Sequence, residues 1–285
     1  MCVGDYDWHY ANGGNASECP LILLHGFTGS LRIWDDVAAV LSHAKHTIAV
    51  DLPGHGGTRA PDDVVAFRMQ SVSEAFVDFV NSLGHTCIDL WGYSMGGRLA
   101  LYVAMGNPGL VRNLILESAS PGLSDREDRE TRVAADAALA DRIERDGMER
   151  FVAEWTAQPL FESQDRMEPK RRERARAIRL GNSARGLALS LRGMGTGSQE
   201  PLHERLESLR CPTLILNGAL DSKFCAIGSA MRQKIPEARH RVIPDCGHAP
   251  HWENPRMSAH IVSELLDERP IAGTVDRGSV VTGRE

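Results

Sequence analysis

The sequence lacks any apolar stretch long enough to cross a bilayer, and neither sign of charge is in large excess. The formal net charge is −6, from 38 acidic and 32 basic residues, which argues against non-specific binding to nucleic acid. Residues 1–10 contain no basic region followed by an apolar core, so no secretory signal is expected. We therefore expect a cytoplasmic protein that neither inserts into a membrane nor binds nucleic acid.

Paired cysteines are also missing, because none of the six forms a C-x-x-C motif. This spacing suggests neither a zinc site nor a disulfide framework. In a cytoplasmic protein, reduced thiols with partial burial are the expected state. The cysteines are Cys2, Cys19, Cys87, Cys211, Cys225 and Cys246.

What the sequence does contain is a series of short apolar runs that end in glycine or polar residues, with helical patterns between them. Continuous apolar strands alternating with helices are typical of a parallel sheet buried on both faces. The sequence therefore predicts an α/β architecture with a mostly parallel central sheet and helices on both sides. The predicted strands lie at residues 21–24, 47–50, 87–91, 114–116, 213–216 and 241–243.

The pattern changes after Ser120-Pro121-Gly122, and no strand signal returns before about residue 199. This segment instead has apolar residues at helical spacing and many charged residues. We interpret residues 122–200 as a helical lid over the carboxyl edge of the sheet, where ligands bind in open α/β folds. Residues 1–121 and 201–269 then form the core. A final helix is predicted near 256–266, and 270–285 as a flexible tail.

The pentapeptide Gly92-Tyr93-Ser94-Met95-Gly96 directly follows the apolar run at 87–91 and precedes a helical pattern. A serine between two glycines in this setting is typical of a sharp strand-to-helix turn that exposes a nucleophilic hydroxyl. Glycine–serine clusters are also common in ordinary loops. The distinction depends on whether an acid and a histidine follow in the right places.

Two such residues stand after predicted strands further along the chain. Asp221 follows the run at 213–216, and His248 follows the run at 241–243. The order Ser94, Asp221, His248 is that of a hydrolase-type catalytic triad. In this arrangement His248 takes the serine proton while Asp221 orients the imidazole and stabilises its charged form.

An oxyanion hole would accompany the triad. The expected donors are the backbone N–H groups of Met95 and of Phe27, which lies in the loop after the strand at 21–24. His248 and His251 are spaced as a metal-binding pair could be, but no matching set of ligands accompanies them. We therefore expect no metal and no cofactor, and we interpret His251 as a structural or substrate-shaping residue.

With these motifs in place, the sequence resembles the α/β-hydrolase superfamily over residues 18–267. Within that superfamily it resembles the 2-succinyl-6-hydroxy-2,4-cyclohexadiene-1-carboxylate synthases of menaquinone (vitamin K2) biosynthesis. The segments that carry this resemblance are 92–98, 116–123, 190–197, 221–224 and 247–251, together with a lid stretch containing Trp155, 158–161 and Arg179.

The resemblance implies a lyase that eliminates pyruvate from 2-succinyl-5-enolpyruvyl-6-hydroxy-3-cyclohexene-1-carboxylate. Ser94, activated by His248 and Asp221, would remove the proton next to the succinyl ketone, and the oxyanion hole would stabilise the resulting enolate. Because this substrate is a tricarboxylate, arginines are the expected binding residues. The candidate substrate contacts are Tyr93, Arg98, Arg132, Trp155, Arg179, Arg192 and Lys223.

The alternative is a serine hydrolase that acts on an ester, a thioester or a vinylogous C–C bond, with Ser94 as a true nucleophile. Fold and triad fit both activities, because function depends on the site and not on the fold. The arginines and the lid segments favour the lyase.

Overall fold

A seven-stranded sheet forms the centre of the computed structural model, which describes residues 1–267. Its strand order is β3-β5-β4-β6-β7-β8-β9, and β1 and β2 form a separate pair. Within the large sheet only β3 runs antiparallel to its neighbour. The predicted mostly parallel α/β architecture is therefore confirmed. The strands are β1 (Cys2–Val3), β2 (Tyr6–Asp7), β3 (Tyr10–Gly13), β4 (Leu21–Leu24), β5 (Thr47–Val50), β6 (Ile88–Tyr93), β7 (Val111–Glu117), β8 (Thr213–Gly218) and β9 (Arg239–Ile243).

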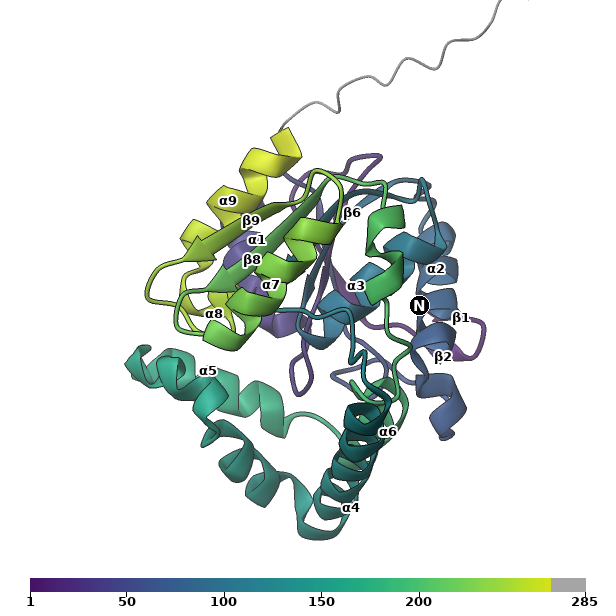
Figure 1. Cartoon of the computed structure of the whole chain (residues 1–285), viewed down its shortest axis with the longest axis vertical. Coiled ribbons are helices and arrows are strands. Elements are labelled where there is room, and N and C mark those ends of the chain that lie inside the picture. The colour runs from purple at the N-terminus through teal and green to yellow at the C-terminus, as the bar shows by residue number, and fades with distance from the viewer. Residues whose placement is uncertain (268–285) are drawn as a thin grey trace, which may run out of the picture.

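Helices cover both faces of this sheet, with α2, α3 and α7 on one face and α1, α8 and α9 on the other (Figure 1). The α-helices are α1 (Asp35–Leu41), α2 (Met69–Ser82), α3 (Met95–Gly106), α4 (Arg126–Thr156), α5 (Pro169–Leu180), α6 (Ala184–Met194), α7 (Ser222–Lys234), α8 (Pro250–Glu253) and α9 (Pro255–Asp267). Four 3-10 helices accompany them: η1 (Leu31–Trp34), η2 (Val64–Phe67), η3 (Pro159–Arg166) and η4 (His203–Ser208).

The strand β4 illustrates why the apolar runs have no polar alternation. Side chains alternate across a strand, so Ile22 and Leu24 pack in one hydrophobic cluster while Leu21 and Leu23 pack in the other. All four are buried. A strand covered on both faces is apolar at most positions, which is why the sequence pattern located buried strands such as β4, β5 and β8. The edge strand β9 is mostly exposed, and only its apolar end was visible in the sequence.

The strands β1, β2 and β3 were not predicted. The first two are only two residues long, and β3 carries the residues Asn12 and Gly13, which are disfavoured in strands. β3 is held at the sheet edge by antiparallel pairing with β5. Its formation therefore depends on a tertiary contact and not on its own residues.

Between β7 and β8 the described chain contains helices and loops but no strand. The helices α4, α5 and α6 lie together beyond one edge of the sheet (Figure 1). α4 is interrupted at Gly147, which has a φ of 79°. The division into core and lid at residues 121 and 200 stays an interpretation, and the predicted tail at 270–285 lies outside the described residues.

Cys19 and Cys87 form a disulfide, which corrects the expectation that all thiols are reduced. Each cysteine lies just before a strand, and the strands β4 and β6 are parallel neighbours with Leu21 opposite Asp89. Their Cα atoms are therefore only 5.0 Å apart. The other four cysteines are free. The sequence could not predict the pairing because it depends on strand order.

Over residues 1–267 we find no helix that combines the length and the apolar character needed to span a membrane.

Candidate active site

The site begins at the turn between β6 and α3, where Ser94 has a φ of 51°. This left-handed conformation is strained for a residue with a side chain and is typical of functional positions. A Cβ on Gly92 would lie 2.3 Å from the Gly96 carbonyl oxygen, and one on Gly96 would lie 2.4 Å from the Leu24 carbonyl oxygen. The turn therefore requires both glycines of the motif.

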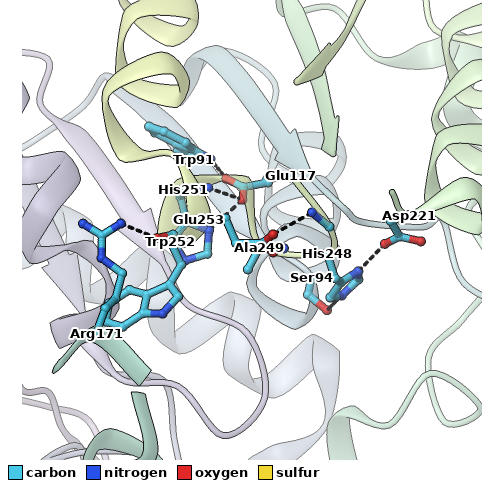
Figure 2. Close-up of polar contacts among 11 residues, drawn as sticks. Trp91, Ser94, Glu117, Arg171, Asp221, His248, Ala249, His251, Trp252 and Glu253 are labelled. Atoms are coloured by element: carbon cyan, nitrogen blue, oxygen red, sulfur yellow. Dashed lines mark hydrogen bonds and ion pairs between the residues drawn. The ribbon is translucent and has the colours of Figure 1, made fainter. Parts of the chain in front are cut away.

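A chain of hydrogen bonds joins Ser94, His248 and Asp221 (Figure 2). His248 Nε2 lies 3.2 Å from Ser94 Oγ, and His248 Nδ1 lies 2.6 Å from Asp221 Oδ2. Because a carboxylate only accepts, Nδ1 carries the proton and Nε2 is free to accept from the serine hydroxyl. Asp221 also caps α7, since its Oδ1 accepts from the Phe224 amide at 3.1 Å. Asp221 and His248 are both buried.

Two residues near Ser94, Phe27 and Met95, have backbone amides without a partner. Neither the Phe27 N–H nor the Met95 N–H donates a hydrogen bond to another residue within 1–267. Met95 is the first residue of α3, so its amide also lies at the positive end of the helix dipole. These are the two amides that the sequence predicts as an oxyanion hole.

Two buried histidines hold the loop that carries Phe27. His25 Nδ1 donates to the Gly26 carbonyl at 2.8 Å, and His25 Nε2 accepts from the Leu52 amide at 2.9 Å. His55 Nε2 accepts from the Thr28 amide at 3.2 Å. Burial lowers the pKa of both imidazoles, and that of His55 falls well below its usual value because the neighbouring His25 adds to the effect. Both rings are therefore neutral and fix the loop backbone on either side of Phe27.

Ser94 and His248 open onto a cavity of about 660 Å³ that is also lined by residues of α4 and α6. Four of its lining residues are cationic, namely Arg98, Arg132, Arg142 and Lys223, whereas the single carboxylate among them is Asp136. The same cavity is lined by Phe27, Tyr93, Met95 and Trp155. The structure thus brings seven of the predicted site residues together around Ser94 and His248.

Arg98 lies in the first turn of α3 and is buried. Its guanidinium donates to Gln199 Oε1 and to the Met194 carbonyl, both at 2.7 Å. No carboxylate of the described chain pairs with it. Burial lowers its pKa to about 10, with a further contribution from Arg132. Arg98 therefore remains cationic at neutral pH and carries an uncompensated charge at the cavity wall.

Arg132 has a partner in the free site, because its Nε donates to Asp136 Oδ1 at 2.8 Å one helical turn away. Burial raises the pKa of Asp136, although Arg132 opposes this shift. The other oxygen of Asp136 has no hydrogen-bond partner within the described chain.

Arg179 occupies a small pocket of about 40 Å³ beside the large cavity, with Phe27, Tyr93 and Phe161 lining both. It donates to Gln164 Oε1 at 3.2 Å, and burial lowers its pKa. The guanidinium lies 5.5 Å from the Phe161 ring centroid, a cation–π distance. Arg179 is thus adjacent to the cavity but not part of its wall.

The prediction that Arg192 contacts the substrate is corrected. Arg192 does not line either pocket. Its guanidinium instead pairs with Asp141 at 2.6 Å and Glu144 at 2.7 Å on α4. Both partners are acidic surface residues, so the side chain holds α6 against α4 on the outer side.

The sequence reasoning missed Arg142, although a signal for it was present. Arg132, Asp136, Leu139 and Arg142 recur at helical spacing along α4, and all four line the cavity. It also missed Glu117, which accepts a hydrogen bond from His251 Nδ1 at 2.6 Å. No group of three potential metal ligands occurs among residues 1–267.

Comparison with known proteins agrees with this geometry. The family described as alpha/beta hydrolase fold matches residues 20–255, so the chain belongs to the α/β-hydrolase fold family. A Bacillus subtilis (strain 168) protein named "Putative 2-succinyl-6-hydroxy-2,4-cyclohexadiene-1-carboxylate synthase" is 43% identical over 254 residues, covering 89% of this chain and 92% of the relative. Within the fold family, the chain belongs to the 2-succinyl-6-hydroxy-2,4-cyclohexadiene-1-carboxylate synthases.

Two solved structures are also similar. The structure of MenH from S. aureus has a TM-score of 0.86 and 32% identity, covering 93% of this chain and 98% of that one. A thermophilic esterase from Thermogutta terrifontis, solved with malate bound, has a TM-score of 0.81 and 27% identity, covering 92% and 93% respectively.

Proposed function

We propose that the protein is a carbon–oxygen lyase that converts 2-succinyl-5-enolpyruvyl-6-hydroxy-3-cyclohexene-1-carboxylate into 2-succinyl-6-hydroxy-2,4-cyclohexadiene-1-carboxylate and pyruvate. The observation that carries the proposal is the Ser94–His248–Asp221 hydrogen-bond chain at the wall of a mainly cationic cavity. A substrate with three carboxylates needs a cavity in which cationic side chains outnumber acidic ones, as they do here. The named relatives in the family support the same reaction.

The reaction needs a base but no attacking water. Ser94 Oγ, with its proton passed to His248 Nε2, takes the proton from the ring carbon that bears the succinyl ketone. The electron pair moves through the ring double bond, the ring carbon–oxygen bond breaks, and the enolpyruvyl group leaves to become pyruvate after protonation on carbon. Asp221 stabilises the imidazolium that forms on His248.

The amides of Phe27 and Met95 would meet the ketone oxygen as it gains negative charge. Preorganised donors of this kind stabilise developing charge without reorganisation at the moment of reaction. The loop that carries the Phe27 amide is held by His25 and His55, which are both neutral. The amide is therefore positioned without a charged side chain that could draw a substrate carboxylate away from the cavity.

We assign the carboxylate contacts to Arg98, Arg132 and Lys223 in the cavity, with Arg179 at its side and Tyr93 and Trp155 shaping the walls. Arg98 is the strongest candidate, since neutral acceptors hold its guanidinium in place and leave its charge available. Arg132 would loosen its contact with Asp136 or share its guanidinium with the substrate. Arg142 extends the set.

The second candidate is a hydrolase, favoured by the 27% identity to a solved esterase. In that reaction Ser94 would attack a carbonyl carbon and form an acyl-enzyme. The same triad and amides would serve, so the two activities differ in the substrate that the cavity admits. We also propose a cytoplasmic location, which suits the four free cysteines but not the Cys19–Cys87 disulfide.

One assay separates the candidates. The enolpyruvyl substrate is supplied to the wild-type protein and to Ser94→Ala, and pyruvate release is followed with a coupled enzyme beside a panel of p-nitrophenyl esters. We expect rapid pyruvate release by the wild type and its loss in Ser94→Ala. Fast ester turnover without pyruvate would favour the hydrolase, and full pyruvate release by Ser94→Ala would remove the serine from the mechanism.

A further inference from the structure

A second carboxylate–histidine pair, Glu117 and His251, lies beside the triad (Figure 2). Glu117 is the last residue of β7 and is fully buried. Its carboxylate accepts three N–H bonds, from Trp91 Nε1 at 2.9 Å, from the His251 amide at 2.9 Å and from His251 Nδ1 at 2.6 Å. No lysine or arginine of the described chain pairs with it.

Glu117 connects the segment that carries Ser94 with the segment that carries His248. The Glu117 carbonyl accepts from the Ser94 amide at 2.8 Å. Trp91 stands three residues before Ser94 in β6, and His251 stands three residues after His248 in α8. One residue therefore holds both the turn that carries the serine and the segment that carries the base.

Tyr93 fills the space between the two histidines. Its ring centroid lies 4.5 Å from that of His251 and 5.4 Å from that of His248. On its other side His251 packs against Trp34 at 4.4 Å. His251 Nε2 has no hydrogen-bond partner within residues 1–267. The ring is thus fixed by tilted contacts with Tyr93 and Trp34 and by its Nδ1 bond to Glu117.

Stability by itself gives little reason for a carboxylate here. A buried charge costs desolvation energy, and a well-packed apolar residue of similar volume often stabilises a core equally well. What the carboxylate adds is directional bonding to donors on two separate segments.

We propose that Glu117 is a positioning residue that, through His251 and Trp91, sets the separation between Ser94 Oγ and His248 Nε2. The inference rests on the proposed roles of Ser94 and His248. It does not require Glu117 or His251 to touch the substrate.

The first test substitutes Glu117→Gln, which keeps the shape but places an NH₂ group against N–H donors. Ser94 reactivity is measured as the rate of modification by a fluorophosphonate, and kcat and KM are measured by pyruvate release. We expect both the modification rate and kcat to fall by roughly ten- to a hundredfold, since small misplacements at a reacting centre have effects of this order. KM should stay within about twofold, because no substrate contact is removed.

Asp89→Asn is the matched control. Asp89 is also a buried carboxylate on the same strand pair, and it accepts from Arg112 and Asn113 at the opposite end of β6. Both variants should unfold at lower temperature than the wild type. Only Glu117→Gln should slow the modification of Ser94. Equal losses in the two variants would mean that the effect is one of general stability.

His251 supplies a second pair of variants that does not depend on Glu117→Gln folding. In His251→Asn the amide nitrogen takes about the place of Nδ1 and can still donate to Glu117, whereas His251→Leu removes the donor. We expect His251→Asn to retain most of the Ser94 reactivity and His251→Leu to lose it. Combining Glu117→Gln with His251→Leu should add little further loss, because residues that act as a unit are non-additive.

Wild-type modification rates in Glu117→Gln and His251→Leu would overturn the proposal. This outcome is distinct from failure of the proposed lyase activity, because fluorophosphonate modification does not require the enolpyruvyl substrate.

Discussion

At the level of single residues, the arginines differ in the hydrogen-bond and ion-pair partners of their guanidinium groups. Arg98 is buried and held by neutral acceptors, so its charge is available to a ligand. Arg192 instead forms ion pairs with two acidic side chains at the surface, so its charge is already neutralised. Two arginines that look equivalent in the sequence therefore have opposite expected effects on substrate binding.

We predict that Arg98→Ala raises the KM for the enolpyruvyl substrate by roughly ten- to a hundredfold, the range for a charge-assisted hydrogen bond to a carboxylate. Arg98→Lys should restore little, because an ammonium group does not reproduce the planar fork. Arg192→Ala is the matched control and should leave KM unchanged. Steady-state kinetics of pyruvate release decide the matter, and equal KM values for Arg98→Ala and wild type would contradict the assignment.

His55 gives a prediction about pH. Its folded-state pKa lies well below the unfolded value because the ring is buried. Between the two pKa values the unfolded state binds more protons, so the free energy of unfolding falls as the pH drops below about 6.5. We expect His55 to contribute about 1 kcal/mol of this loss between pH 7.5 and 5.5.

Urea denaturation at the two pH values measures this contribution, with His55→Gln as the comparison. Glutamine can still accept from the Thr28 amide but does not titrate. The variant should lose less stability on acidification than the wild type. An identical pH dependence in both proteins would show that His55 is not the titrating group.

Among the elements, the docking of α6 depends on a glycine pair. A Cβ on Gly186 would lie 2.5 Å from the Gly54 carbonyl oxygen, and one on Gly54 would lie 2.4 Å from the Gly186 carbonyl oxygen. Backbone therefore touches backbone where α6 meets the loop after β5. Since α6 supplies Ser190, Leu191 and Met194 to the cavity wall, its placement also affects the site.

We predict that Gly186→Ala destabilises the protein by about 1–3 kcal/mol, because the added methyl group must displace backbone. Gly106→Ala is the control, since nothing lies within 4 Å of its added Cβ and it closes α3 at an ordinary φ. That variant should be neutral or slightly stabilising. Thermal and urea unfolding distinguish the two, and a neutral Gly186→Ala would contradict the close contact.

Elements that are buried on both faces could be predicted well from the sequence. β4 and β5 occur where the apolar runs indicated them, because burial demands apolar residues at each position. β3 could not be predicted, since its Asn12 and Gly13 disfavour a strand and only pairing with β5 supports it. The helical character of α4 was visible in its spacing, but the break at Gly147 was not.

For the molecule as a whole, the Cys19–Cys87 bridge joins the amino ends of two neighbouring strands, at the opposite edge of the sheet from Ser94. We predict that the double variant Cys19→Ser with Cys87→Ser lowers the free energy of unfolding by about 2–4 kcal/mol. Its kcat should be unchanged, because the carboxyl edge that carries the site is not touched.

Denaturant unfolding with and without dithiothreitol, together with pyruvate kinetics, measures both effects. Cys2→Ser, at an exposed free cysteine, is the control and should match the wild type. A dithiothreitol-insensitive wild type would contradict the stabilising role of the bridge. Loss of kcat in the double variant would contradict the separation of bridge and site.

The sequence by itself determined the fold class and the order of Ser94, Asp221 and His248, because burial patterns and turn motifs are local properties of the chain. The tertiary structure decided the rest. It turned Arg192 outward, brought Arg142 to the cavity, and paired Glu117 with His251 across 134 positions. The direction of a side chain and the identity of its distant partner depend on strand order and helix packing. Neither property can be predicted from the residues that are adjacent in the sequence.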